Sequence, residues 1–180
     1  MRFYYLIGQP GAGKTTLLAT LLAGAVPDPH SQPVPHLAYY DRVGSILGAE
    51  IGKRRDTFAG TDALALGVQP KAVAWVHTQP FDLLIAEGDR LANDGFFKAV
   101  EGAGYTLTVL WLDTPDAEAQ RRRDARGSRQ NPTWVKGRVR KVAGLAQRWP
   151  VVRLDGTRPT AELAQECWQM QGLDRFRRQP

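Results

Sequence analysis

The sequence contains little cysteine and histidine. Its 180 residues include one Cys and three His. Cys167 has no second thiol within the chain, so no internal disulfide can form. The shortage of soft ligands also argues against a structural zinc site, which takes Cys and His side chains. The lack of an internal disulfide agrees with a reducing compartment, and we expect the protein to act in the cytoplasm.

Long hydrophobic runs are also missing. No stretch approaches the 18 apolar residues of a transmembrane helix, so we expect no membrane partner. Residues 2–7 have the pattern of a strand that runs into a glycine-rich loop, and this differs from a signal peptide.

Acidic residues are outnumbered by basic ones. The chain has 24 Lys and Arg against 18 Asp and Glu, a net charge of +6. Most of the surplus lies in residues 121–158 and in the C-terminal tail. Such a surplus can be a solvated surface, a clamp for nucleotide phosphates or a footprint for nucleic acid, and composition does not separate the three.

The length fits one α/β domain, and we expect residues 1–180 to form it. Strand-length runs alternate with helical patterns, which predicts a five-stranded parallel sheet with helices on both faces. These runs are residues 2–7, 36–41, 81–88, 105–113 and 150–155. Ligands of such sheets bind at the carboxyl ends of the strands. Residues 27–35 contain four prolines, which exclude a helix or a central strand and predict a surface connection.

The most informative motif is residues 8–15, which fit G-x-x-x-x-G-K-[ST] between a strand and a helix. Glycines let such a loop point its N–H groups at phosphate oxygens. Lys14 can place its charge between the β- and γ-phosphates, and the Thr15 hydroxyl can ligate Mg²⁺. We therefore expect ATP and Mg²⁺ as cofactors. The predicted nucleotide-binding residues are Gly8, Gln9, Pro10, Gly11, Ala12, Gly13, Lys14, Thr15 and Thr16.

The sequence lacks the guanine-reading N-K-x-D of switch GTPases. It resembles the small P-loop kinases of the nucleoside and nucleotide kinase superfamily. The resemblance rests on the phosphate loop, on Asp41 as the acid that ends the second expected strand, and on Glu87-Gly88-Asp89-Arg90, and it extends to the arginine-rich residues 121–129 and to residues 153–159. The resemblance implies a phosphotransferase with an alcohol acceptor and a lid at about residues 121–137. It also implies that lid arginines, for which Arg126 and Arg129 are the best candidates, steady the transferred phosphoryl group. The turn at residues 153–159 would help to hold adenine.

Several acids and one arginine are candidates for the remaining roles. Glu87 is expected near Mg²⁺, directly or through a bound water. Kinases of this superfamily that phosphorylate hydroxyls often use an acid at the end of the second strand, which implies Asp41 as the base, with Asp89 as second choice. Asp41 could instead cap a helix. Arg90 could clamp an acceptor phosphate or simply begin a helix.

Residues 58–64, 68–70, 86–93 and 130–137 carry a closer resemblance, to bacteriophage 5-hydroxymethyluracil DNA kinases, which act in thymidine hypermodification. It implies that the acceptor is the hydroxymethyl group of a pyrimidine within DNA. Such a base must leave the stack, and an aromatic side chain could receive it. The candidates are Phe58, Trp75, Phe96, Phe97 and Trp134. Thr61 and Asp62 could bond the pyrimidine edge or merely cap a helix.

Two alternatives stay open. One is a kinase of a free nucleoside or nucleotide. The other is a nucleotide-gated DNA-binding module without transfer activity. The sequence also leaves open the oligomeric state, the choice between ATP and GTP, and the preference for single- or double-stranded DNA.

Overall fold

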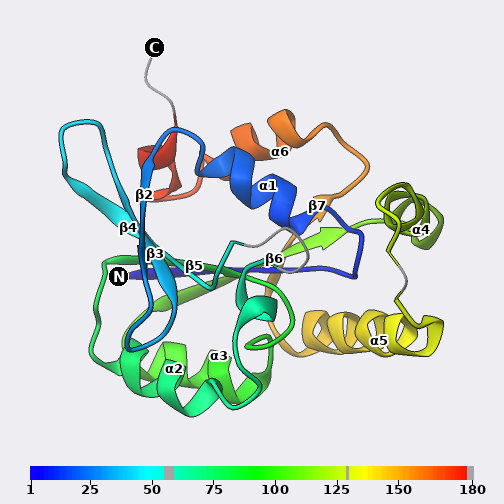
Figure 1. Cartoon of the computed structure of the whole chain (residues 1–180), viewed down its shortest axis with the longest axis horizontal. Helices are drawn as coiled ribbons and strands as arrows, with labels where there is room; N and C mark the ends of the chain where they lie inside the picture. The colour runs from blue at the N-terminus through cyan, green and yellow to red at the C-terminus, as the bar shows by residue number, and fades with distance from the viewer. Residues whose placement is uncertain (55–58, 129, 178–180) are drawn as a thin grey trace.

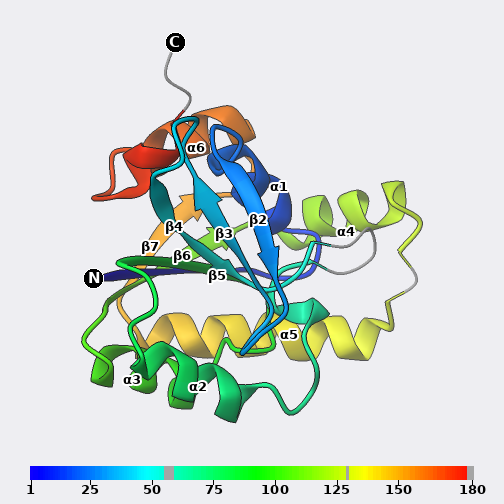
Figure 2. The same ribbon diagram turned by 60° about the vertical axis from the view of Figure 1, so that its left-hand side comes forward.

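A computed structural model describes residues 1–54, 59–128 and 130–177. Its strands form one seven-stranded sheet in the order β2-β3-β4-β5-β1-β6-β7 (Figures 1 and 2). Five neighbouring strands are parallel: β4 (Ile46–Ile51), β5 (Leu83–Glu87), β1 (Arg2–Ile7), β6 (Thr106–Asp113) and β7 (Val151–Asp155). The other two, β2 (Val26–His30) and β3 (His36–Tyr40), are antiparallel to their neighbours. The predicted α/β class is confirmed.

The sheet differs from the prediction in its number of strands, because β2 and β4 were not expected. β2 lies within the proline-rich segment that was predicted to be a surface connection. All five of its residues are exposed, and within the described part of the chain β3 is its single partner strand. An edge strand tolerates proline because its outer side needs no N–H donor. β4 was not predicted because Gly48 and the buried Glu50 interrupt its apolar pattern.

The direction of β3 is opposite to the predicted one. Residues 36–41 were expected to run parallel to the other strands, which would bring Asp41 to the phosphate loop. Instead β3 is antiparallel to β4, and Tyr40 pairs with Ile46 at the start of that strand. Asp41 therefore lies at the opposite end of the sheet from the loop.

Helices cover both faces of the sheet, as predicted (Figure 1). One face carries α1 (Lys14–Leu21) and α6 (Thr160–Cys167), and the other carries α2 (Gln69–His77), α3 (Asp94–Gly102) and α5 (Pro132–Arg148). The remaining helix, α4 (Asp116–Ala125), follows β6. Two short 3₁₀ segments are η1 (Thr61–Ala63) and η2 (Leu173–Phe176). In the described residues no helix is both long and apolar enough to span a membrane.

The strand β1 shows how the two cores arise. Its side chains alternate between the faces of the sheet, as the period of a strand requires. Phe3 and Tyr5 join the cluster under α2 and α3, whereas Tyr4 joins the cluster under α1 and α6. Three aromatic candidates for a base platform belong to the first cluster and do not line the main cleft described below. They are Trp75, Phe96 and Phe97, all buried.

Candidate functional site

The phosphate loop follows β1 directly and is fixed from outside by α4. Gly11 has a φ of +87°, and a Cβ there would lie 2.3 Å from the carbonyl oxygen of Ala119. No other residue type fits this approach without a shift of the helix. Arg122 of α4 donates to the carbonyl oxygen of Ala12 at 3.0 Å, and Arg123 donates to that of Pro10. α4 therefore holds the loop in place by donating hydrogen bonds to the carbonyl oxygens of the loop.

Lys14, Thr15 and Glu87 meet at the loop. The Nζ of Lys14 donates to the carbonyl oxygens of Gly8 and Gln9 at 2.9 and 3.3 Å. The Thr15 hydroxyl donates to Glu87 Oε1 at 2.7 Å. Glu87 ends β5 and is only 2% exposed. Burial raises the pKa of its carboxyl to about 7, against the opposing effects of Lys14 and Thr15.

This burial predicts a pH-dependent stability of the ligand-free protein. Between pH 4.5 and about 7 the folded Glu87 carboxyl keeps a proton that the unfolded chain has released. The free energy of unfolding therefore falls as pH rises through this window, by about 3 kcal/mol at about 1.4 kcal/mol per pH unit. Urea unfolding at pH 5 and pH 8 should show Glu87→Gln gaining this amount over the wild type at pH 8, with little difference at pH 5.

The exposed Glu101 on α3 supplies the matched control, because Glu101→Gln removes the same charge from a solvated position. That variant should follow the wild type at both pH values. Equal pH dependence in Glu87→Gln and the wild type would contradict the raised pKa of Glu87.

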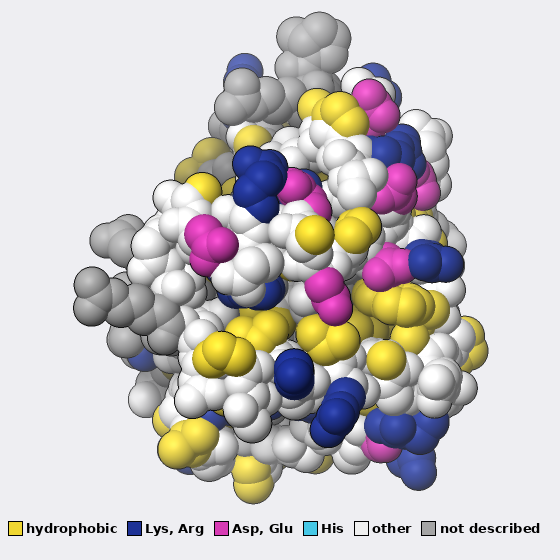
Figure 3. Space-filling view, turned by 90° about the vertical axis from the view of Figure 1, so that its right-hand side faces the viewer, with side chains coloured by type: hydrophobic (Ala, Val, Ile, Leu, Met, Phe, Trp, Pro, Cys, Tyr) yellow, Lys and Arg dark blue, Asp and Glu magenta, His cyan; other side chains and the backbone are white. Residues whose placement is uncertain are grey.

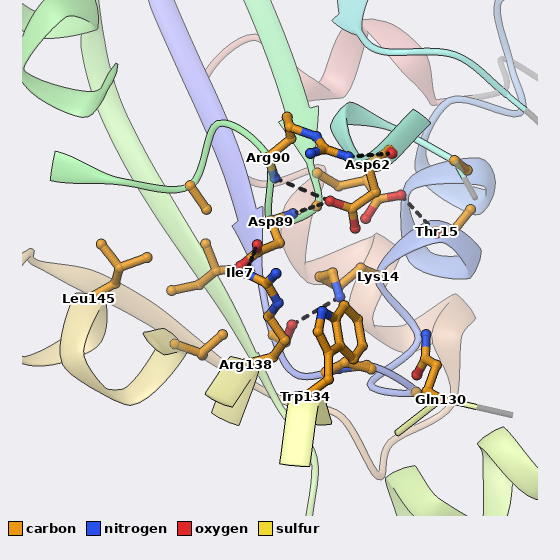
Figure 4. Close-up of a pocket in the computed structure, with 18 of the residues that line it drawn as sticks. Ile7, Lys14, Thr15, Asp62, Asp89, Arg90, Gln130, Trp134, Arg138 and Leu145 are labelled. Carbon is orange, nitrogen blue, oxygen red and sulfur yellow. Dashed lines mark hydrogen bonds and ion pairs between the residues drawn. The ribbon is translucent and has the colours of Figure 1, made fainter. Parts of the chain in front are cut away.

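A cleft of about 620 Å³ opens beside Lys14 and Thr15, and we call it the main cleft (Figure 4). Part of the lining is apolar and comes from several elements. The apolar side chains are Ile7, Leu66, Ala92, Val142 and Leu145. The polar groups of the lining come from the carboxyl end of β5, from η1 and from α5, so the cleft is amphipathic.

Asp62 of η1 binds the turn that follows β5. Its Oδ1 accepts from the backbone N–H groups of Asp89 and Arg90 at 2.7 and 3.1 Å. Gly88 makes this close approach possible, because its φ is +110° and a Cβ there would lie 2.7 Å from Thr61 Oγ1. Asp62 lines the main cleft, and Figure 4 shows it between the Asp89–Arg90 backbone and Thr15.

The helix α5 also lines the cleft and bonds to the turn after β5. Its Arg138 and Lys141 both form ion pairs with Asp89, and the distance from Lys141 Nζ to Asp89 Oδ1 is 2.9 Å. Trp134, one turn before Arg138, is 39% exposed, and the Arg138 guanidinium lies 5.0 Å from the centre of its ring. Asp89 thus has cations on both oxygens, while an aromatic face is accessible in the same cleft.

A second hollow, of about 390 Å³, lies on the other side of the phosphate loop. Gly13 and Thr16 line it from the loop and α1, Arg126 from the end of α4, and Gly156 and Arg158 from the turn after β7. Its lining joins the predicted phosphate loop to the turn at residues 153–159.

The structure brings together some predicted site residues and separates others. The phosphate loop, Glu87, Asp62, Asp89 and Arg90 surround the main cleft. Thr61 is buried, and its Oγ1 lies 3.2 Å from the Tyr5 hydroxyl. Thr61 therefore packs beneath the residues that line the cleft and is not itself part of the lining. Arg126 lines the second hollow and donates to the Arg122 carbonyl oxygen. Phe58 and Arg129 lie outside the described residues.

The expectation that Asp41 stands beside the loop is wrong. Asp41 closes the turn between β3 and β4, where its Oδ1 accepts from the N–H groups of Val43 and Ser45 at 2.9 and 2.8 Å. These bonds lower the pKa of its carboxyl. The cause of the wrong placement is the antiparallel direction of β3, because only parallel strands share their carboxyl ends.

Arg138 and Lys141 were not predicted as site residues. The signal for them is present in the sequence, because they lie three residues apart in a helix that has no acid. Residues at this spacing share a helix face. The acid they meet could not be found in the same way, since Asp89 is 49 residues from Arg138 in the chain.

Metal ligands are sparse around the loop. Among the described residues no three His, Cys, Asp or Glu side chains gather in a way that could hold a metal ion. Thr15 and Glu87 supply one hydroxyl and one carboxylate, which fits Mg²⁺ held mostly by phosphate oxygens and water.

Comparisons with known proteins agree with this geometry. Among solved structures, a sugar kinase from Janibacter sp. HTCC2649, solved without ligand, is similar with a TM-score of 0.54 at 11% identity, over 94% of this chain and 93% of that chain. This likeness concerns the fold. No curated protein matches. The profile of the family described as P-loop Nucleotide Kinase3 matches residues 1–158, which include the phosphate loop, the main cleft and α5. The prediction of a P-loop kinase is thereby confirmed, and the chain belongs to the P-loop Nucleotide Kinase3 family.

Proposed function

We propose that this kinase uses ATP to phosphorylate an alcohol, and that the alcohol is the hydroxymethyl group of 5-hydroxymethyluracil in DNA. The observation that carries the first part is the main cleft, which places carboxylates within the same cavity as Lys14 and Thr15. Phosphoryl transfer depends mainly on position and charge, and this cavity offers both.

The nucleotide would occupy the phosphate loop and the second hollow. The loop's N–H groups and Lys14 would hold the phosphates, and the adenine would lie between Thr16 and the turn that carries Arg158. Mg²⁺, when bound, would neutralise charge on the β- and γ-phosphates. Thr15 and Glu87 are the residues that would hold it. The predicted lid, at about residues 121–137, would cover the nucleotide, with Arg126 lining the second hollow.

Asp62 is the best-placed group to accept the proton of the alcohol. Asp41 is remote, and both oxygens of Asp89 are engaged by Arg138 and Lys141. Asp62 uses one oxygen to bind two backbone N–H groups and keeps the other toward the cleft. In the reaction the alcohol oxygen bonds to the γ-phosphorus, the bond from that phosphorus to the β–γ bridging oxygen breaks, and the proton passes to Asp62.

Three features of the main cleft favour a nucleobase as the carrier of that alcohol. Its volume of about 620 Å³ exceeds what a base alone requires. Trp134 presents an accessible ring on which a base can stack. The apolar side chains of Leu66, Val142 and Leu145 line the same cleft and give a base further nonpolar surface to pack against.

The test is transfer from γ-labelled ATP to matched oligonucleotides that contain either 5-hydroxymethyluracil or thymine at one position. Both ends of each strand should be blocked by phosphate, so that the hydroxymethyl group is the only primary alcohol. We expect label in the modified strand alone. Label that appears only in the free nucleoside would reject the DNA acceptor in favour of a nucleoside kinase. Nucleotide-dependent DNA binding without any transfer would favour the regulatory module.

A further inference from the structure

The helix α5 carries more positive charge than the main cleft uses. Its seventeen residues include five cations and no acid. Arg138 and Lys141 pair with Asp89, and Arg148 pairs with Asp94. Lys136 and Arg140 are exposed and have no ion pair within the described ranges. Because they are four residues apart, they lie on the same side of the helix, one turn from each other.

Both of these cations line a groove of about 520 Å³ between α4 and α5. We call it the α4–α5 groove and define it by Gln120, Arg123, Gln130, Lys136, Val139 and Arg140. Asp116, an acid, also lines it and accepts from the Gln9 side chain at 2.9 Å. Figure 3 looks onto the side that carries both helices, and its lower part, at the height of α5, shows Lys and Arg with few acids.

The groove adjoins the main cleft at one shared residue. Gln130 lines both cavities, and its Oε1 is buried without a hydrogen-bond partner among the described residues. A buried amide oxygen without a donor is uncommon, and a ligand N–H group at the junction would satisfy it. Nucleobases present such groups, and a strand that crosses the junction also carries a phosphate backbone for the cations beyond it.

We propose that the α4–α5 groove binds the backbone of the single strand that flanks the target nucleotide. The inference rests on the proposed function, because it takes a nucleic-acid acceptor as the ligand of the main cleft. Lys136 and Arg140 contact consecutive parts of the backbone, and Gln130 meets a base at the junction. Val139, between the two cations along the helix, contacts the sugar or base face.

The experiment measures binding of a fluorescent, unmodified single-stranded 20-mer by anisotropy over a series of salt concentrations. It needs neither ATP nor a hydroxymethylated base. We expect affinity to fall as salt rises. In the double variant Lys136→Gln/Arg140→Gln the slope of log K against log salt should shrink by about 1.4, at about 0.7 for each lost phosphate contact. The charge-conserving variant Lys136→Arg/Arg140→Lys should keep the wild-type slope.

The matched control removes two exposed lysines from α2 and α3, as Lys71→Gln/Lys98→Gln. It changes the net charge equally and should leave the slope unchanged. An equal loss of slope in the control, or binding that does not depend on salt, would overturn the inference. Displacement of the strand by poly-glutamate at equal charge concentration would assign the groove to an acidic protein segment instead.

The two proposals fail in different ways. Transfer to a free nucleoside with no binding of the 20-mer would overturn the groove and the DNA acceptor while leaving an alcohol kinase in place. Salt-dependent binding that requires Lys136 and Arg140, together with no transfer to 5-hydroxymethyluracil, would keep the groove and reject the proposed acceptor.

Discussion

Lys14→Ala is expected to lower phosphoryl transfer by about 10³-fold, because a cation placed at the migrating phosphoryl group is worth this much or more in related reactions. Lys14 begins α1, and its Nζ donates hydrogen bonds to the carbonyl oxygens of Gly8 and Gln9. Its charge is therefore already held at the loop before nucleotide binds. Its removal takes away a positive charge that no other side chain of the loop supplies. The measurement is kcat and KM with saturating acceptor, alongside circular dichroism to show that the fold persists.

Lys71→Ala is the matched control, since it removes a lysine from the exposed side of α2. Its activity should equal that of the wild type. A second readout ties the effect of Lys14→Ala to the site. Lys14 lowers the pKa of Glu87, so the variant should move the pH dependence of stability to higher pH. Transfer within tenfold of the wild type would mean that Lys14 does not contact the transferred phosphate.

The sequence was sufficient for the phosphate loop because that motif is local. Residues 8–15, the strand before them and the helix after them are contiguous, and each has the spacing its element requires. Glu87 followed from the same logic, since it ends a buried strand that pairs in parallel with β1. Because β1 and β5 are parallel, their carboxyl ends lie at the same end of the sheet.

The sequence was insufficient where an element's direction or a distant partner decides the site. In sequence, the run that ends at Asp41 has the pattern of any other strand. Its antiparallel pairing with β4 is what places Asp41 at the end of the sheet opposite the phosphate loop. The ion pairs that join Asp89 to α5 depend on how that helix packs against the end of β5. Hydrophobic periodicity states which face of a helix is buried but not which acid its basic residues meet.

Asp62→Asn should lower kcat by about 10² to 10⁴, the range that a general base contributes. Asparagine keeps a carbonyl oxygen that can accept from the N–H groups of Asp89 and Arg90, so the turn after β5 should persist. What it loses is the negative charge that takes the proton of the alcohol. Nucleotide binding, measured separately, should change little, because Lys14 and the phosphate loop are untouched.

Two further variants assign this effect to Asp62. Asp41→Asn, at the far end of the sheet, should keep wild-type activity, because the amide oxygen of the new side chain would still accept from the N–H groups of the turn. Asp89→Asn should weaken the ion pairs that join Arg138 and Lys141 to the turn after β5. Its main effect should be a higher KM for the acceptor. If Asp89→Asn instead abolishes kcat while Asp62→Asn does not, then Arg138 and Lys141 release Asp89 when the acceptor binds, and Asp89 is the base.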